Sequence, residues 1–234
     1  MTIVNLSSVK NSRSTNLTIG LHQSYICGDH RPIMRGYLHG SVLFFIILWI
    51  AVDPTSLQSM HRAIVPTLAA IIWTLSCSSL LHLIPWTDIR IQTVVLRCDK
   101  CGIVAICFAS FVAPQLTDAM HCRPSVLFTL IVSALPNLIS AALIALGDTS
   151  PRVFLGCLMS SLLTGLFMAR IDQKLVLYLG ITFALYGGSM VLYVWKPGGD
   201  KKWWGYHEWM HVLVILSFYF NFQGISYLAE VCSS

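Results

Sequence analysis

The sequence predicts an all-α integral membrane protein, a bundle of seven transmembrane helices. Of its 234 residues, 56% are hydrophobic and only 11% are charged, and the mean hydropathy is +0.71. These values lie outside the range of soluble globular chains. A membrane-spanning helix needs roughly 17 to 25 mainly apolar residues, and the apolar runs of this chain are too long and continuous for the strands of a barrel.

Seven apolar runs without Lys, Arg, Asp or Glu predict the spanning helices. Turn and charge clusters such as Asp53-Pro54 and Lys196-Pro197 separate several of them, and such clusters end helices. The short connections predict that consecutive helices pack as antiparallel neighbours. We therefore expect a flexible polar tail over residues 1–36 and a seven-helix membrane domain over residues 37–232. The runs are Tyr37–Val52, Ala63–Trp86, Cys101–Thr117, Pro124–Leu146, Val153–Ala169, Leu175–Trp195 and Trp209–Ala229.

The distribution of Lys and Arg predicts the orientation of the bundle. If the N-terminus is cytoplasmic, eleven of these residues lie on the cytoplasmic side and four on the other side. Cytoplasmic loops carry the excess of positive residues. We therefore expect a cytoplasmic N-terminus and an outside or lumenal C-terminus. The same bias explains the formal net charge of +5, which does not indicate nucleic-acid binding.

Two histidines four residues apart, His207 and His211, stand at the start of the last apolar run. Residues with this spacing project from one helix face. In the predicted topology His82, at the end of the second run, lies at the same membrane face. Three neutral imidazoles with one open position are typical of a catalytic zinc site, which acidifies a bound water to a pKa of about 7. Anchoring in an interfacial aromatic belt is the alternative.

Two further polar residues are expected near these histidines. Asp99 precedes the third run at the same face, and Ser78 lies one helical turn before His82. We expect Asp99 to accept a hydrogen bond from the metal-bound water or from a ligand imidazole, with Ser78 orienting it. The alternative is a solvated interfacial charge, because Arg97 and Lys100 lie beside Asp99.

His39 and two cysteines lie at a similar predicted depth. For His39, in the first run, helix packing or interfacial anchoring is favoured over metal binding. Cys98 and Cys101 form a C-x-x-C arrangement, which can bind metal or form a redox pair. On a reducing cytosolic face, free thiols are the expected state. Cysteines within helices, such as Cys107 and Cys157, are expected to be small packing residues, and no disulfide is expected.

Four segments, in order along most of the chain, resemble motifs of one protein family. Residues 31–40 resemble its entry to the first helix, and Ser78-Ser79-Leu80-Leu81-His82 resembles its Ser-x-x-x-His motif. Leu96-Arg97-Cys98-Asp99 followed by Gly102-Ile103 resembles the start of its third helix. Residues 204–211 resemble its closing His-x-x-x-His motif. The chain is thus similar to the hemolysin III branch of the progestin and adipoQ receptor family.

The resemblance implies a seven-helix fold with a cytoplasmic N-terminus and a zinc ion bound by His82, His207 and His211. Ser78 and Asp99 match positions that accompany the metal in this family. The family is related to membrane hydrolases of lipid amides, and it includes hormone-responsive receptors and bacterial proteins described as cytolytic. The resemblance therefore supplies a site more firmly than a function.

Three classes of function remain open from the sequence. The first is a zinc-dependent hydrolase of an amide or ester bond in a membrane lipid. The second is a ligand-responsive receptor with structural zinc, and the third is a membrane-permeabilising protein. A zinc peptidase is a rival enzyme class, because His207-Glu208-x-x-His211 fits H-E-x-x-H with Glu208 as the general base. The ordered matches at Ser78, His82 and Asp99 favour the hemolysin III type, which makes Glu208 a bystander.

Overall fold

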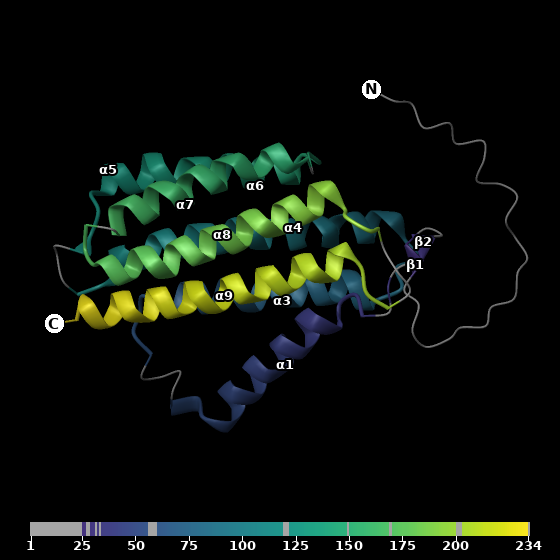
Figure 1. Ribbon diagram of the computed structural model, residues 1–234, viewed down its shortest axis with the longest axis horizontal. Helices are drawn as coiled ribbons and strands as arrows, with labels where there is room; N and C mark the ends of the chain where they lie inside the picture. The colour runs from purple at the N-terminus through teal and green to yellow at the C-terminus, as the bar shows by residue number, and fades with distance from the viewer. Residues whose placement is uncertain are drawn as a thin grey trace, which may run out of the picture.

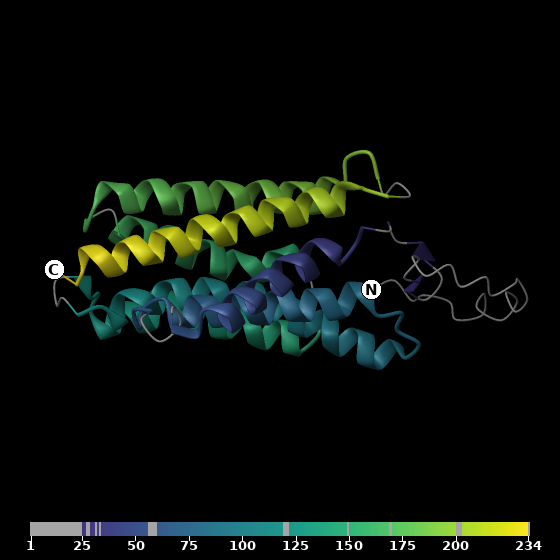
Figure 2. The same ribbon diagram turned by 90° about the horizontal axis from the view of Figure 1, so that it is seen from below.

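The computed structural model describes residues 25–26, 29–30, 32, 34–55, 60–118, 122–148, 150–168, 170–199 and 203–233. Within these ranges the fold is helical, and most helices run along the long axis of the molecule (Figure 1, Figure 2). The exception is a two-stranded antiparallel pairing of β1 (Tyr25–Ile26) with β2 (Asp29–His30). Most of the predicted tail over residues 1–36 lies outside the described residues.

The helices follow the order of the predicted apolar runs. Among the described residues, α3, α8, α9 and the segment Leu127–Ala145 are long and apolar enough to cross a membrane, and α1 and α7 are shorter apolar helices. These lengths fit an integral multi-pass membrane protein. The bounds are α1 (Tyr37–Val52), α3 (Val65–Leu83), α4 (Ile89–Val112), η2 (Ala113–Leu116), α5 (Val126–Thr129), η4 (Leu130–Ala134), α6 (Leu135–Ala145), η5 (Pro151–Phe154), α7 (Leu155–Met168), α8 (Gln173–Trp195) and α9 (Tyr206–Val231).

The helix α4 begins twelve residues before the third apolar run that the sequence predicts at Cys101. The Asp88 side chain accepts a hydrogen bond from the Arg90 backbone nitrogen at 2.7 Å and caps the helix. Charged residues do not break a helix, so the polar stretch before Cys101 joins α4 rather than forming a loop. One of these residues, Arg97, donates to the carbonyl of Ala145 at 2.9 Å and so satisfies a terminal group of α6.

One spanning segment contains a wide helical turn. Residues Leu130–Ala134 form a π-helical turn, η4, between α5 and α6. Pro136 lies two residues after this turn, and a proline inside a helix removes one backbone donor and clashes with the carbonyl four residues earlier. The wider turn relieves this clash, so the apolar segment continues as a helix up to Ala145.

Consecutive helices pack as neighbours, as the short connections predict. The hairpins α3–α4 and α8–α9 make the most extensive contacts, and α8 and α9 lie side by side in both views (Figure 1, Figure 2). The helix α1 contacts α3 and α9, whereas α6 and α7 contact α4. Ile71, Leu75, Ile106 and Phe218 form a buried cluster between α3, α4 and α9. Large apolar side chains on the outer faces, such as that of Phe45, suit a lipid surround.

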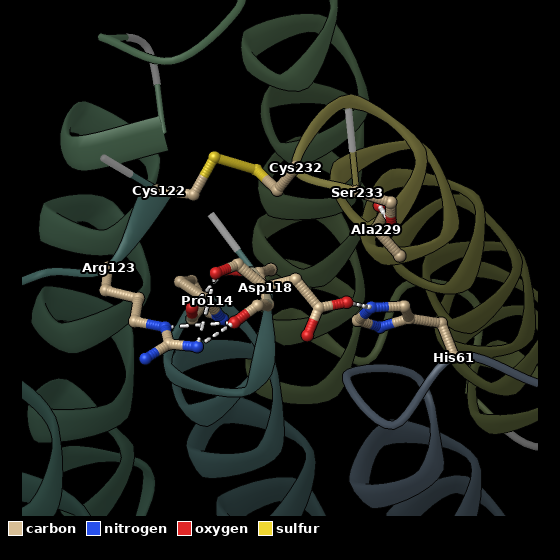
Figure 3. Close-up of a disulfide and its surroundings, with 9 residues drawn as sticks. His61, Pro114, Asp118, Cys122, Arg123, Ala229, Cys232 and Ser233 are labelled. Atoms are coloured by element: carbon tan, nitrogen blue, oxygen red, sulfur yellow. Dashed lines mark hydrogen bonds and ion pairs between the residues drawn. A yellow bond between two sulfur atoms is a disulfide. The ribbon is translucent and has the colours of Figure 1, made fainter. Parts of the chain in front are cut away.

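A disulfide joins Cys122 to Cys232, so the expectation of no disulfide is wrong. The bond connects the segment before α5 to the residue after α9, across 110 residues of sequence (Figure 3). Neither cysteine stands in a motif, and the wide separation hides the pairing from a reading of the sequence. The bond ties the α3–α4 side of the bundle to the end of α9.

Ionic contacts surround this disulfide. His61 Nε2 lies 3.2 Å from Asp118 Oδ2 (Figure 3). Arg62 pairs with the other oxygen of the same carboxylate. The hydrogen bond from His61 and the charge of Arg62 hold the pKa of Asp118 below its ordinary value. Arg123 also donates to the carbonyl of Thr117 at 2.9 Å. This end of the bundle is therefore closed by polar contacts as well as by a covalent bond.

We expect Cys122→Ser and Cys232→Ser each to lower the free energy of unfolding by about 2 to 4 kcal/mol, because a closed loop restricts the unfolded chain. The double variant should match either single variant, since all three lack the same bond. Thermal unfolding in detergent measures the loss. Cys98→Ser, which changes a half-buried free thiol, is the control. Additive losses in the double variant would contradict a shared bond.

Candidate functional site

Three histidines from two hairpins meet at the end of the bundle that lies opposite the disulfide. His82 lies in the last turn of α3, and His207 and His211 lie in the first two turns of α9. One ring nitrogen of each can be chosen so that all three lie within 4.8 Å of one another. The Nε2 atoms of His82 and His207 are 3.4 Å apart. The three residues could therefore hold one metal ion.

The hydrogen bonding of His211 supports a ligand at this cluster. His211 is buried, and neither of its ring nitrogens has a hydrogen-bond partner in the described part of the chain. A buried polar group without a partner costs free energy. A cation bound between the three rings would satisfy one of these nitrogens.

Glu208 stands between the two histidines of α9, yet both of its carboxylate oxygens are engaged elsewhere. Oε1 accepts a hydrogen bond from Arg35 Nε at 3.1 Å, and Oε2 accepts one from the Gly205 backbone nitrogen at 2.7 Å. The second bond satisfies the backbone donor of Gly205, the N-cap residue of α9, as a glutamate at the third helical position does in a capping box. Glu208 is fully buried and is not part of the histidine cluster.

Ser78 and Asp99 lie beside the histidines. Both line the same cavity as His82, His207 and His211, with a volume of about 460 Å³. Ser78 Oγ is buried, completes no hydrogen bond in the described residues and lies next to the Asp99 carboxyl group. Asp99 is not among the groups close enough to share a metal with the histidines. Asp99, which can accept a proton or a hydrogen bond, thus lies near the candidate metal site but is not one of its candidate ligands.

His39 is a residue whose place in the site the sequence does not reveal. Its ring packs edge-on against His211, with ring centroids 4.2 Å apart, and it lines the same cavity. His39 is 3% exposed, and both of its ring nitrogens lack hydrogen-bond partners among the described residues. Its depth in α1 is predictable, but the approach of α1 to α9 is not.

The chain just before α1 covers the histidines. Met34 N donates to the carbonyl of Trp203 at 3.3 Å, and Arg35 pairs with Glu208, so residues 34–36 lie against the start of α9. The end of the predicted tail therefore belongs to the site. Gly36 has a φ of +89°, and a Cβ at this position would lie 2.9 Å from the Cβ of His82. Only glycine fits such a backbone and such a close approach.

The two cysteines around Asp99 are free and half-buried, as the sequence predicts. They form no disulfide with each other. Trp73 Nε1 donates to the backbone carbonyl of Cys98 at 3.4 Å. Neither thiol lies in the histidine cluster.

The helical fold and the apolar outer faces define an integral, multi-pass membrane protein with a buried three-histidine cluster at one end. The family model described as "Haemolysin-III related" matches residues 28–222 of the chain. The protein therefore belongs to the haemolysin-III related family, which confirms the resemblance found in the sequence. No curated protein matches the chain.

We expect Gly36→Ala to displace His82 and weaken metal binding at least about tenfold, the usual size of a change in the groups that orient metal ligands. Gly40→Ala is the matched control, because a Cβ there would meet Leu83 Cδ1 at an ordinary 3.4 Å on helical backbone. Metal content after dialysis against a graded chelator series measures both. Equal metal retention by the two variants would contradict the role of Gly36.

Proposed function

We propose that the protein is a zinc-dependent hydrolase of an amide or ester bond in a membrane lipid. The observation that carries the proposal is the cluster of His82, His207 and His211, of which His207 is half-buried and the others are buried, at the head of an apolar cavity. Family membership supports the site, because the motifs around these residues resemble those of its zinc-binding members. The domain division stays as proposed from the sequence, with a tail over residues 1–36 and a membrane domain over residues 37–232.

Zinc fits the donors of this cluster better than magnesium or calcium does. Imidazole nitrogens suit zinc, whereas magnesium and calcium prefer oxygen ligands. Zinc–nitrogen bonds of the usual length in a tetrahedron place two nitrogens about 3.3 Å apart. One pair, His82 Nε2 and His207 Nε2, is at 3.4 Å, a distance that a hydrogen bond between the rings also gives, and the three candidate nitrogens lie within 4.8 Å of one another. Three protein ligands leave one coordination position open, which is typical of catalytic zinc.

The residues around the cluster can perform the acid–base part of a hydrolysis. A bound zinc ion supplies Lewis acidity, which activates water and polarises a carbonyl group. The Asp99 carboxylate would accept the proton of the attacking water and return it to the leaving nitrogen or oxygen. The Ser78 hydroxyl, which lies beside it, would hold the carboxylate in one orientation. Glu208 has no part in this scheme, because Arg35 and Gly205 occupy both of its oxygens.

The cavity suits a lipid as substrate. Its lining on α9 runs from His207 to Asn221 and on α8 from Leu179 to Tyr193. Fourteen residues of helix correspond to roughly 21 Å, so the cavity extends deep into the bundle. Most of the lining surface is apolar, and side chains such as those of Leu81, Ile103 and Leu158 contribute to it. An acyl chain can fill such a space while the bond to be cleaved lies at the histidines.

The proposed topology has seven spans, with the N-terminus in the cytoplasm and the C-terminus outside or in a lumen. The disulfide supports it, because Cys122 and Cys232 belong to the side that the positive residues assign to the exterior. Disulfides persist in oxidising compartments and are rare in the cytosol. Cys98 and Cys101, which are free, belong to the proposed cytoplasmic side. Charge bias and cysteine state thus favour the same orientation.

We expect Arg170→Cys, at an exposed position in the loop before α8, to react with a membrane-impermeant maleimide from the outer or lumenal side of oriented, sealed vesicles. Cys98 should react only after the vesicles are permeabilised. Mass spectrometry of the labelled peptides distinguishes the two thiols. Labelling of the Arg170→Cys thiol from the cytoplasmic side would reverse the topology.

We expect the purified, zinc-loaded protein to hydrolyse members of a panel of lipid amides and esters. His207→Ala and His211→Ala should lose both bound zinc and turnover. Asp99→Asn should keep zinc but lose turnover by at least about a hundredfold, the usual contribution of a general base. Glu208→Gln is the control that separates a peptidase-like site from this one. It should be less stable, because its buried ion pair is broken, but should keep its turnover per bound zinc.

The outcomes of this assay separate the proposed function from its rivals. Protein without stoichiometric zinc, or with zinc retained after both histidine substitutions, contradicts the metal site. Bound zinc without hydrolysis across the panel favours a ligand-responsive receptor with structural zinc. Liposome leakage that survives removal of zinc favours a membrane-permeabilising protein.

A further inference from the structure

The cavity that begins at the histidines ends among polar side chains inside the bundle. Ser110, Thr164, Thr182 and Asn221 line it, one each from α4, α7, α8 and α9. Each is at least nine-tenths buried. Asn221 follows His211 by ten residues on one helix, which corresponds to roughly 15 Å. We call these four residues the inner polar cluster.

Asn221 has hydrogen-bonding capacity that the protein does not use. Its Nδ2 donates to Ser110 Oγ at 2.7 Å, and the same Oγ lies 3.1 Å from Asn221 Oδ1. Ser110 Oγ also bonds the carbonyl of Ile106 at 2.8 Å, so one hydroxyl hydrogen serves two acceptors. A carboxamide carries two N–H donors and an acceptor oxygen. Within the described residues, one N–H of Asn221 therefore remains without an acceptor beside the cavity.

A second buried asparagine shows what helix packing alone requires. Asn137 lies outside the cavity, and its Nδ2 donates to the carbonyl of Ser133 at 2.9 Å and to Ser160 Oγ at 3.2 Å. Among the described residues two acceptors serve the two amide hydrogens of Asn137, although its buried Oδ1 has no partner, whereas Ser110 Oγ is the acceptor of the Asn221 amide. The remaining amide hydrogen of Asn221 is available to a molecule in the cavity, because Asn221 is part of the cavity lining.

The other members of the cluster offer acceptors. Thr164 and Thr182 donate their hydroxyl hydrogens to carbonyls of their own helices, at 2.7 and 2.9 Å. Their oxygens keep lone pairs that can accept a hydrogen bond. The charged residues in the cavity lining, Asp99 and Lys100, belong to its other end. The inner polar cluster therefore suits a neutral group that both donates and accepts, which is a hydroxyl group.

We propose that the inner polar cluster binds a hydroxyl group carried on the acyl chain of the lipid, roughly 15 Å from the end held at the histidines. This inference rests on the proposed function, because it assumes that the chain lies along the cavity with its head at the metal candidate. The preferred substrates are then lipids whose acyl chain is hydroxylated far from the carbonyl group.

The test compares three free fatty acids, which need no turnover, in a displacement assay on the zinc-loaded protein in detergent. The acids are octadecanoic acid and its derivatives with a hydroxyl two thirds along the chain or beside the carboxyl group. We expect the acid with the distant hydroxyl to bind about tenfold more tightly than octadecanoic acid, the value of one good hydrogen bond.

Asn221→Leu should abolish this tenfold preference, measured as the ratio of the affinities for the distant-hydroxyl acid and octadecanoic acid. Thr164→Val, which removes one acceptor and keeps the shape, should reduce the preference a few-fold and provides a second reading if Asn221→Leu fails to fold. Asn137→Leu is the matched control, since it removes a buried asparagine outside the cavity and should keep the full preference. No variant should change the relative affinity of the acid with the hydroxyl beside its carboxyl group.

Each outcome decides the inference separately from the proposed function. Equal binding of the distant-hydroxyl acid and octadecanoic acid overturns the inference, as does failure of all three acids to bind. A preference that survives both Asn221→Leu and Thr164→Val also overturns it. A preference that depends on Asn221 in a protein without hydrolytic activity supports the inference, although the proposed hydrolase then fails.

Discussion

The buried ion pair between Arg35 and Glu208 is the interaction on which the histidine cluster depends. Glu208 is fully buried, so its carboxylate must keep both of its partners to offset the loss of water. Those partners are Arg35 from the segment before α1 and the backbone nitrogen of Gly205. A helical turn moves as a unit, and a fixed Glu208 therefore also fixes the directions of His207 and His211 on either side of it.

The site is divided between two hairpins that must be held in register. The hairpin α3–α4 supplies His82, Ser78 and Asp99, whereas α8–α9 supplies the other two histidines. Direct contacts between α3 and α9 are sparse beside those within each hairpin, because the cavity lies between them. Connections at the two ends compensate for this. The Arg35–Glu208 pair and α1 join the hairpins beside the histidines, and the Cys122–Cys232 bond joins them at the far end.

The sequence predicts features that depend on local pattern and not those that depend on distant pairs. The bounds of α1 agree with the first apolar run, and the i, i+4 spacing correctly places His207 and His211 on one face of a helix. The charged first half of α4 is harder to predict. Hydropathy identifies the residues that lie in the membrane and not the residue at which a helix begins. Glu208 pairs with a residue 173 positions away, and no periodicity of the sequence encodes such a contact.

His39 illustrates the same limit at the candidate site. Its depth follows from its position in α1, but its contact with His211 depends on how α1 crosses α9. That crossing depends in turn on Gly36, where the absence of a side chain lets the chain pass His82 closely. Sequence alone shows a glycine before a helix, which is common. Only the packed structure shows that a Cβ at this glycine would push against a metal-ligand candidate.

The charges of the cavity lining give a bound amphiphile one favourable direction. Asp99 and Lys100 lie toward the histidines, whereas the inner end offers only neutral hydroxyl and amide groups. Burying a charge beside neutral groups costs far more than burying a hydroxyl. A lipid can therefore enter chain first, with its head left among the ionisable residues, but not head first. In the proposed hydrolase, this polarity would bring the bond nearest the head group to the histidines and to Asp99.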